Sequence, residues 1–320
     1  MGRYLLRRSI LLLPTLFVIS VVAFLSIRLM PGAMPGIGSF ALTPQERHLL
    51  GLGSPIHVAY WEWLLGLFTN SLGQSLWTSR LLTTELARRL PVTLELTLLS
   101  TLVAQLIAVP SGVFTALRRS RMAASFGKTA GMLLGSLPVM WLGVLALVLP
   151  RAWWGWTPPQ KYTLFSVDPL AHLWQVLIPA VAIGIVVAGP MIGALHAAAA
   201  DISSRDYMRT ARAKGLRPGT VLVRHGLRNG IAPWLTASVR QLPWVVAGVI
   251  IMEHIFGLPG VGRLFLDAVN QRDFPFISGL LLVSGVTGML AYFAADVLRA
   301  WLDPRVRYVS VDPVGWGFEV

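Results

Sequence analysis

The stretch PLAHLWQVLIPAVAIGIVVAGPMIGALHAAAA, from Pro169 to Ala200, contains no Asp, Glu, Lys or Arg. A helix of about 20 apolar residues is long enough to cross a bilayer core of roughly 30 Å. Four further windows also lack these charged residues, and we expect each of them to cross the membrane: 9–27, 96–117, 129–150 and 274–295. A chain with this many apolar segments is predicted to be a polytopic membrane protein.

The composition of the whole chain supports this interpretation. Of its 320 residues, 55% are hydrophobic and only 13% are charged, about half the charged share of an average soluble domain. A soluble surface cannot hide that much apolar area, so the composition argues against a soluble enzyme and against a disordered chain. The absence of cysteine excludes disulfides and any cysteine-based metal or redox site.

A sixth window, 233–256, is apolar except for Arg240 and Glu253. We count it as a span because Arg240 lies about 10 Å along the helix from Pro233. From that depth its long side chain can reach the membrane interface.

We therefore predict an all-α membrane protein with six transmembrane helices. A first helix over 1–30 is followed by a folded extracytoplasmic segment over 31–91, which we call the scoop. A transmembrane core occupies 92–302, and a cytoplasmic tail occupies 303–320. Within the core, a long loop over 197–232 separates the fourth and fifth spans. The core spans are expected at about 92–117, 129–150, 173–196, 233–256 and 275–298.

The basic residues indicate the orientation of the chain, which has a formal net charge of +13. Most of the 27 Lys and Arg residues fall at the N-terminus, in the turn after the second span, in the 197–232 loop and near the C-terminus. Cytoplasmic loops of membrane proteins carry such an excess, so we expect both termini in the cytoplasm. Because these residues are divided among separate loops, they form no single groove for nucleic acid.

The scoop is too long for a turn and carries two signals for helices. Thr43-Pro44-Gln45-Glu46 has the pattern of a capping box with Pro at the first helical position. The residues further along suit a helix that lies at the membrane interface: Trp61, Trp63, Leu64, Leu65, Leu67 and Phe68.

The loop after the fourth span reads DYMRTARAKGLRPGT from Asp206 to Thr220. A short basic helix is predicted to stop at Gly215, and Thr220 can cap a second helix after the Pro-Gly pair. Two short helices joined at a glycine suit a docking element for a cytoplasmic partner. The alternative is that these basic residues only fix the orientation of the chain.

Motifs of membrane-embedded enzymes and of nucleotide binding are missing from the sequence. It contains no HExxH, no GxSxG and no complete P-loop, and its six histidines are scattered. Carboxylates deep in several spans, which proton-coupled transport would need, are also lacking. The alternatives to a subunit driven by another chain are a secondary transporter or channel that works alone and, less favoured by these absences, an enzyme.

Six segments spread along the chain from its start to near its end carry a combination of motifs: RYLLRRSILLLPTLFVISVVAFLSIRLMPG (Arg3–Gly32), RLPVTLELTLLS (Arg89–Ser100), YMRTARAKGL (Tyr207–Leu216), RHGLRNGIAP (Arg224–Pro233), MEHIFGLPGVGRLFLDAVNQRDFP (Met252–Pro275) and LDPRVRY (Leu302–Tyr308). Together they resemble the inner-membrane permease subunits of ATP-binding cassette (ABC) importers of the dipeptide/oligopeptide/nickel family. The first segment resembles the first of the two permeases of such systems.

This resemblance implies a type I ABC importer permease fold in the bacterial inner membrane. It implies a second homologous permease, two cytoplasmic ATPases and an extracytoplasmic solute-binding protein as partners. The chain itself would hold no cofactor, because ATP and Mg would bind to the ATPases. The family's Glu-Ala-Ala pattern is replaced here by Arg209, Thr210 and Ala211. The residues implied in coupling to the ATPases are Arg205, Asp206, Tyr207, Arg209, Thr210, Ala211, Lys214, Gly215 and Leu216.

The resemblance also implies alternating access through a path lined by several spans. We expect Arg240, Gln241 and Glu253 to lie along that path. The alternative for Glu253 is an ion pair with Arg263 or Arg272 in the following segment. Short peptides are the family's commonest cargo, followed by nickel or metal chelates and then glycosides or opines. Selectivity belongs mostly to the binding protein, so the sequence leaves the cargo open.

Overall fold

The described part of the chain is helical apart from short connections. The computed structural model describes residues 2–29, 54–69, 72–117, 121–157, 162–214 and 228–302. Within these ranges the extended pairing consists of one antiparallel bridge between Gln74 and Leu81. The predicted all-α fold class is therefore confirmed for the described residues.

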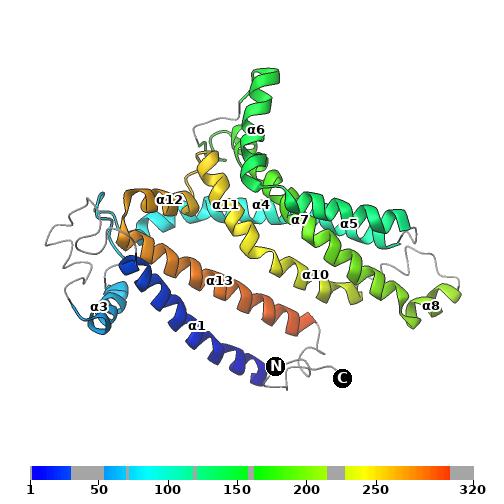
Figure 1. Cartoon of the computed structure of the whole chain (residues 1–320), viewed down its shortest axis with the longest axis horizontal. Coiled ribbons are helices and arrows are strands. Elements are labelled where there is room, and N and C mark those ends of the chain that lie inside the picture. The colour runs from blue at the N-terminus through cyan, green and yellow to red at the C-terminus, as the bar shows by residue number, and fades with distance from the viewer. Residues whose placement is uncertain are drawn as a thin grey trace. The chain divides into compact units, whose positions relative to one another are not determined.

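Four long helices are membrane spans by length and hydropathy: α1 (Gly2–Leu29), α4 (Leu82–Leu117), α7 (Pro169–Ser204) and α13 (Phe274–Leu302) (Figure 1). The fifth candidate span, Pro233–Ile255, combines α10 (Arg228–Arg240) with α11 (Leu242–Ile255). A bent pair, α5 (Arg121–Ser136) and α6 (Val139–Trp154), brings the count among the described residues to six when it is taken as one span.

The third predicted span differs from the continuous helix expected over 129–150. Helices α5 and α6 meet at a bend of 77°. Pro138 precedes α6 in an extended conformation with φ −66° and ψ 123°. Proline has no N–H for the helical ladder, and it disfavours helical geometry at the residue before it, Leu137. These two effects explain why the segment divides here.

The fifth predicted span is also divided. Helix α10 ends at Arg240 and α11 begins at Leu242, so Gln241 forms a turn within the apolar segment. Pro243 cannot donate a backbone hydrogen bond to Val239, which removes one rung of the helical ladder. The Gln241 N–H turns back to the Ser238 carbonyl at 3.1 Å.

Two helices begin earlier than the spans expected from the sequence. Helix α4 starts at Leu82, ahead of the expected 92, and continues through Pro91. Helix α7 starts at Pro169, ahead of the expected 173. The Asp168 carboxylate caps α7 by accepting hydrogen bonds from the N–H groups of Leu170 at 3.1 Å and Ala171 at 3.0 Å. Capping by Asp with Pro at the first helical position is a strong helix start.

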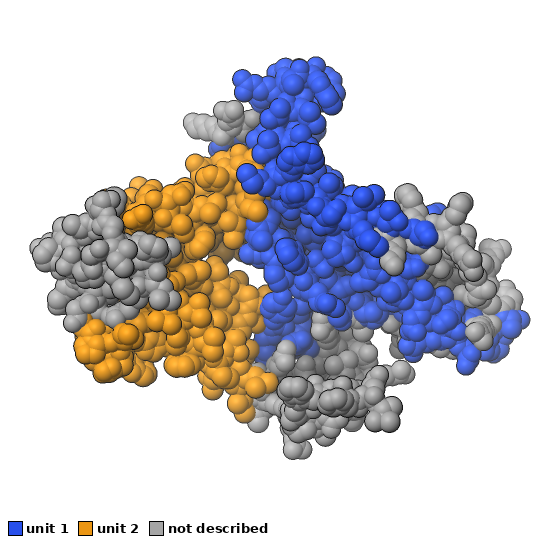
Figure 2. Space-filling model, viewed as in Figure 1, with its two compact units in different colours: residues 1–6, 96–249, 292–320 blue, residues 7–95, 250–291 orange. Residues whose placement is uncertain are grey.

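The chain forms two compact units, coloured separately in Figure 2. The first contains residues 1–6, 96–249 and 292–320. Within it α7 is the central helix, and α5, α6, α10 and the short α8 (Asp206–Ala213) pack against it. The contact between α5 and α7 is very close: a Cβ on Gly189 would lie 2.3 Å from the backbone nitrogen of Gly135 and 2.6 Å from the carbonyl oxygen of Gly131.

The second unit contains residues 7–95 and 250–291. Its core joins the start of α4 to α12 (Val261–Gln271) and to the start of α13 through Leu82, Leu86, Leu264, Ala268, Phe274, Phe276, Ile277 and Leu280. In the same unit, α3 (Ile56–Thr69) packs on α1. There Tyr60 and Phe24 make an edge-to-face contact with ring centroids 5.4 Å apart, and the Tyr60 hydroxyl lies 2.7 Å from Ser20 Oγ.

Part of the predicted scoop lies within the described residues. Helix α3 contains the aromatic stretch expected at the interface, and Trp61 and Leu65 are 59% and 63% exposed. Exposed apolar and aromatic side chains on one helix suit a lipid interface. The predicted capping box at 43–46 lies outside the described residues.

Candidate functional site

The short helix α8 follows directly after α7 and contains the start of the predicted coupling segment. Arg205 ends α7 in an extended conformation with φ −67° and ψ 149°, which turns the chain into α8. Its guanidinium is paired with Asp201 one turn earlier, at 2.8 Å. Both side chains are more than half exposed, so this ion pair adds little stability, and the backbone turn is what positions α8.

Among the side chains of α8 that the structure describes, that of Met208 is buried and polar ones are exposed. Met208 is only 2% exposed, and α8 packs against α7. Asp206, Thr210 and Lys214 are exposed. Thr210 Oγ1 donates to the Asp206 carbonyl at 3.0 Å, and the Lys214 N–H donates to the Thr210 carbonyl at 3.0 Å. This arrangement leaves polar groups exposed while the Met208 side chain holds the helix against the rest of its unit.

The remaining predicted coupling residues are only partly described. Tyr207, Arg209 and Ala211 belong to α8 by their backbone. Gly215 and Leu216 lie outside the described residues, so the predicted helix end at Gly215 stays a prediction. Helix α8 itself ends at Ala213.

Two of the predicted path residues lie at the break in the fifth span. Arg240 is exposed at the end of α10, and Gln241 is half-buried in the turn that follows. Irregular backbone at membrane depth is tolerated where it is buried in protein or lines a water-filled cavity. The break therefore places a cation and an amide side by side along the chain, and their role as path residues stays a prediction.

A polar cluster near this break was not anticipated from the sequence. Trp234 Nε1 donates to Gln105 Oε1 at 2.7 Å, and Gln105 Nε2 donates to Ser238 Oγ at 2.8 Å. These bonds join α4 to α10 by side chains that are partly buried. Gln105 is the one amide in the 96–117 window, whose other polar residues are Ser and Thr, and that amide was the available signal.

Glu253, the third predicted path residue, is completely buried, with 0% exposure. Its Oε1 accepts from Thr93 Oγ1 at 2.7 Å, and its Oε2 accepts from the backbone N–H of Arg263 at 3.0 Å. Arg263 was one of the partners considered from the sequence, but it contributes its backbone N–H to this contact. Its guanidinium instead donates to the Gly257 carbonyl at 2.6 Å and lies 3.9 Å from Asp267.

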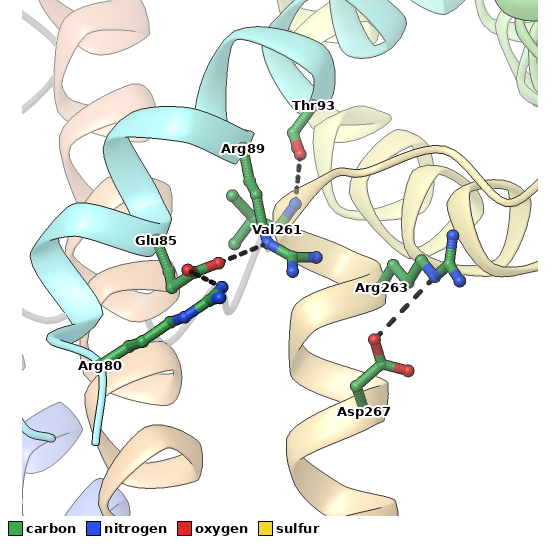
Figure 3. Close-up of polar contacts among 7 residues, drawn as sticks. All are labelled: Arg80, Glu85, Arg89, Thr93, Val261, Arg263 and Asp267. Carbon is green, nitrogen blue, oxygen red and sulfur yellow. Dashed lines mark hydrogen bonds and ion pairs between the residues drawn. The ribbon is translucent and has the colours of Figure 1, made fainter. Parts of the chain in front are cut away.

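The N-terminal end of α4 carries a second buried carboxylate. Glu85 is 5% exposed, and its carboxylate forms ion pairs with the guanidinium groups of Arg80 and Arg89, each at 3.0 Å (Figure 3). Figure 3 also shows Thr93 further along the same helix, bonded to the N–H of Val261 on α12. Arg80, just before α4, and Arg89, within it, thus neutralise the buried Glu85. Thr93, on the same helix, accepts a hydrogen bond from α12.

Asp273 ties the segment before α4 to the start of α13. Its carboxylate accepts from Ser75 Oγ and, at 3.2 Å, from the Leu76 N–H. Burial raises the pKa of this carboxyl above its ordinary value, and the hydrogen bonds from Ser75, Leu76 and Phe276 oppose that rise. Beside it, Trp77 Nε1 donates to the Gln271 carbonyl at 2.8 Å. Residues 72–81 are therefore fastened to the connection between α12 and α13.

Comparison with known families identifies this architecture. Residues 108–308 match the family described as "Binding-protein-dependent transport system inner membrane component". Residues 1–97 match the N-terminal component of the same transport systems. The two matches together cover almost the whole chain.

Individual relatives agree with the family matches. The glutathione transport system permease protein GsiC of Salmonella paratyphi A is 33% identical over 317 residues, covering 96% of this chain and 100% of the relative. GsiC of Escherichia coli (strain K12) is 32% identical over 314 residues, with the same coverage. A solved inward-facing MetNI methionine ABC transporter shares the fold with a TM-score of 0.55 and 17% identity, over 68% of this chain and 96% of that one. The chain therefore belongs to the binding-protein-dependent transport system inner membrane components, the permease subunits of ABC importers, and has their type I fold.

Proposed function

We propose that this chain forms one half of the translocation path of an ATP-driven importer. A second, homologous permease forms the other half, and two cytoplasmic ATPases bind ATP and Mg. An extracytoplasmic solute-binding protein delivers the cargo. Both termini lie in the cytoplasm, and the spans alternate between inward-facing and outward-facing states. A ligand shifts such an equilibrium only through different affinities for the two states, and in this system that ligand is ATP.

The geometry of α8 is the observation that carries this proposal. A short helix leaves the end of α7 after an extended residue, is anchored by Met208 and exposes Asp206 and Thr210, and Lys214 is exposed just after its end. This surface, together with the segment 205–216, docks on an ATPase. Because α8 follows α7 without a flexible linker, a displacement of α8 is transmitted to the helix at the centre of its unit.

The cargo is proposed to be a short peptide of the size and charge of glutathione. Two curated relatives that cover the chain are named as glutathione permeases, and we place the exposed cation of Arg240 on the path. A carboxylate-bearing solute gains from an Arg side chain, which binds carboxylates through paired hydrogen bonds.

Copurification and uptake test the assignment together. The tagged chain, expressed in a bacterium with its partner subunits, is expected to copurify with two ATPases. Uptake of radiolabelled glutathione is expected to stop when cellular ATP is depleted and to survive collapse of the proton gradient while ATP is maintained. A secondary transporter would lose uptake with the gradient and would retain no ATPase through purification. That result would overturn the proposal.

Replacement of Arg240 tests the path. In Arg240→Gln, the half-saturation concentration for glutathione uptake is expected to rise about tenfold, the effect of losing about 1.4 kcal/mol of charge-assisted binding. The maximal rate is expected to change little. Arg151→Gln is the matched control, because Arg151 is an exposed Arg in the last turn of α6. If the two variants have equal half-saturation concentrations, Arg240 does not contact the cargo.

A further inference from the structure

The first turn of α12 is capped by side chains from two other helices. The first N–H groups of a helix have no partner within it, and the residue before α12 is Gly260, which has no side chain to supply one. Thr93 Oγ1 of α4 accepts from the Val261 N–H at 2.8 Å. The Glu253 carboxylate of α11 accepts from the N–H groups of Gly262 and Arg263, the latter at 3.0 Å. Thr93 also donates to Glu253, which closes the network.

The corner between α11 and α12 is capped from both sides. The Glu253 carboxylate of α11 accepts hydrogen bonds from N–H groups at the N-terminus of α12. In return, the Arg263 guanidinium of α12 donates to the Gly257 carbonyl, just beyond the end of α11. A negative group then lies at a helix N-terminus and a positive group at a helix C-terminus, which is the favourable arrangement for both helix dipoles. Gly257 has φ +67°, a conformation that suits glycine at the end of a helix.

Two glycines make room for the buried carboxylate. A Cβ on Gly260 would lie 2.0 Å from Glu253 Cδ, and a Cβ on Gly262 would lie 2.6 Å from Ile250 Cα. Any residue with a Cβ at these two positions would overlap α11. Glycine therefore allows the backbone at the start of α12 to lie close to Glu253. The fit leaves no space beside the carboxylate for a solute.

We propose that Thr93, Glu253, Gly260 and Arg263, here called the α12 clamp, are positioning residues that keep α4, α11 and α12 joined throughout transport. Glu253 acts on import through α12 and does not touch the cargo. Opening the clamp would leave a carboxylate and three N–H groups without partners in a site closed to water, which is strongly unfavourable. The movements of the cycle therefore occur elsewhere. This proposal deepens the proposed function and rests on it for its transport readout only.

Cysteine labelling tests the clamp without any transport. The chain contains no cysteine, so Ala268→Cys introduces a single thiol on α12, at a position that is 4% exposed. In native membranes this thiol is expected to resist a maleimide reagent. Adding Thr93→Val, which removes the hydroxyl but keeps the side-chain shape, is expected to raise the labelling rate at least tenfold. Adding Thr93→Ser, which keeps the hydroxyl, is expected to restore protection.

Gly260→Ala provides a second route to the same result, because its new methyl group displaces Glu253 without removing any polar group. Gly193→Ala is the matched control, since a Cβ on Gly193 meets nothing within 4 Å. In the assembled transporter, labelling of Ala268→Cys is expected to be equally slow with and without ATP. Faster labelling during ATP turnover would show that the clamp opens in the cycle and would overturn the proposal.

Uptake of glutathione separates a positioning role from contact with the cargo. Thr93→Val and Gly260→Ala are expected to lower the maximal rate at least tenfold with an unchanged half-saturation concentration, and Thr93→Ser is expected to retain most of the rate. A change confined to the half-saturation concentration would mean that Glu253 meets the cargo. If wild-type membranes take up no glutathione, the proposed cargo fails, while the labelling results still decide the clamp.

Discussion

Gly189→Ala is expected to separate α5 from α7 and to destabilise the protein by about 3 kcal/mol, the upper end of the usual cost of overpacking. The new Cβ would lie 2.3 Å from the Gly135 nitrogen and 2.6 Å from the Gly131 carbonyl oxygen. Both contacts are to backbone atoms, which cannot rotate away as a side chain can. Relief therefore requires one whole helix to shift. In membranes, close helix packing of this kind depends on small residues.

The measurement is the midpoint of thermal unfolding of the purified transporter in detergent, followed by size-exclusion chromatography. Gly193→Ala is the control, because Gly193 lies on the same helix and borders an open groove of about 410 Å³. Both substitutions remove a helix glycine, so their intrinsic gain in helix propensity is the same. If the two variants unfold at the same temperature, the α5–α7 contact is not as close as described here.

Met208→Asp is expected to reduce uptake to less than a tenth of the wild-type rate while the chain still inserts into the membrane. Met208 is the buried anchor of α8, and a carboxylate in its place would be buried without a partner. Helix α8 would then leave α7, and ATP hydrolysis would no longer be transmitted to the spans. Because α8 is short and polar, its displacement leaves the hydrophobic spans intact.

The two measurements are ATP-dependent uptake and the amount of ATPase that copurifies with the tagged chain. Ser204→Ala serves as the control, since Ser204 is exposed just before the turn and bonds only a neighbouring carbonyl, that of Asp201 at 2.8 Å. It is expected to keep both properties. Full uptake by Met208→Asp would contradict the coupling role that we propose for α8.

The membrane spans could be predicted from the sequence because hydrophobic thickness is a local property of a segment. The 169–200 window lacks charge, and α7 covers it entirely. The breaks at Pro138 and Gln241 were harder to predict, since a proline in a membrane helix produces anything from a slight kink to a full turn. Neighbouring helices decide which, and the sequence does not say where they lie. The 77° bend between α5 and α6 is such a case.

The environment of Glu253 could not be predicted for a related reason. Charge alone suggested either a path residue or an ion pair with a nearby Arg. The observed partners are a hydroxyl 160 positions away, on Thr93, and backbone N–H groups of α12. Capping by side chains of other helices leaves no local pattern. In the sequence, the capping is reflected only in Gly260 and Gly262, which make room for the carboxylate.

The long separation between the contacts of the second unit has a consequence for biosynthesis. Thr93 meets Glu253 across 160 positions, and Ser75 meets Asp273 across 198. While the ribosome is still making the last third of the nascent chain, Ser75 and Thr93 lack these partners. By contrast, Gly135 of α5 and Gly189 of α7 are 54 positions apart, with only α6 between the two helices, so α5 and α7 can pair earlier. A truncated or stalled product would thus display polar groups that the finished permease hides, which gives a membrane protease a means to recognise it.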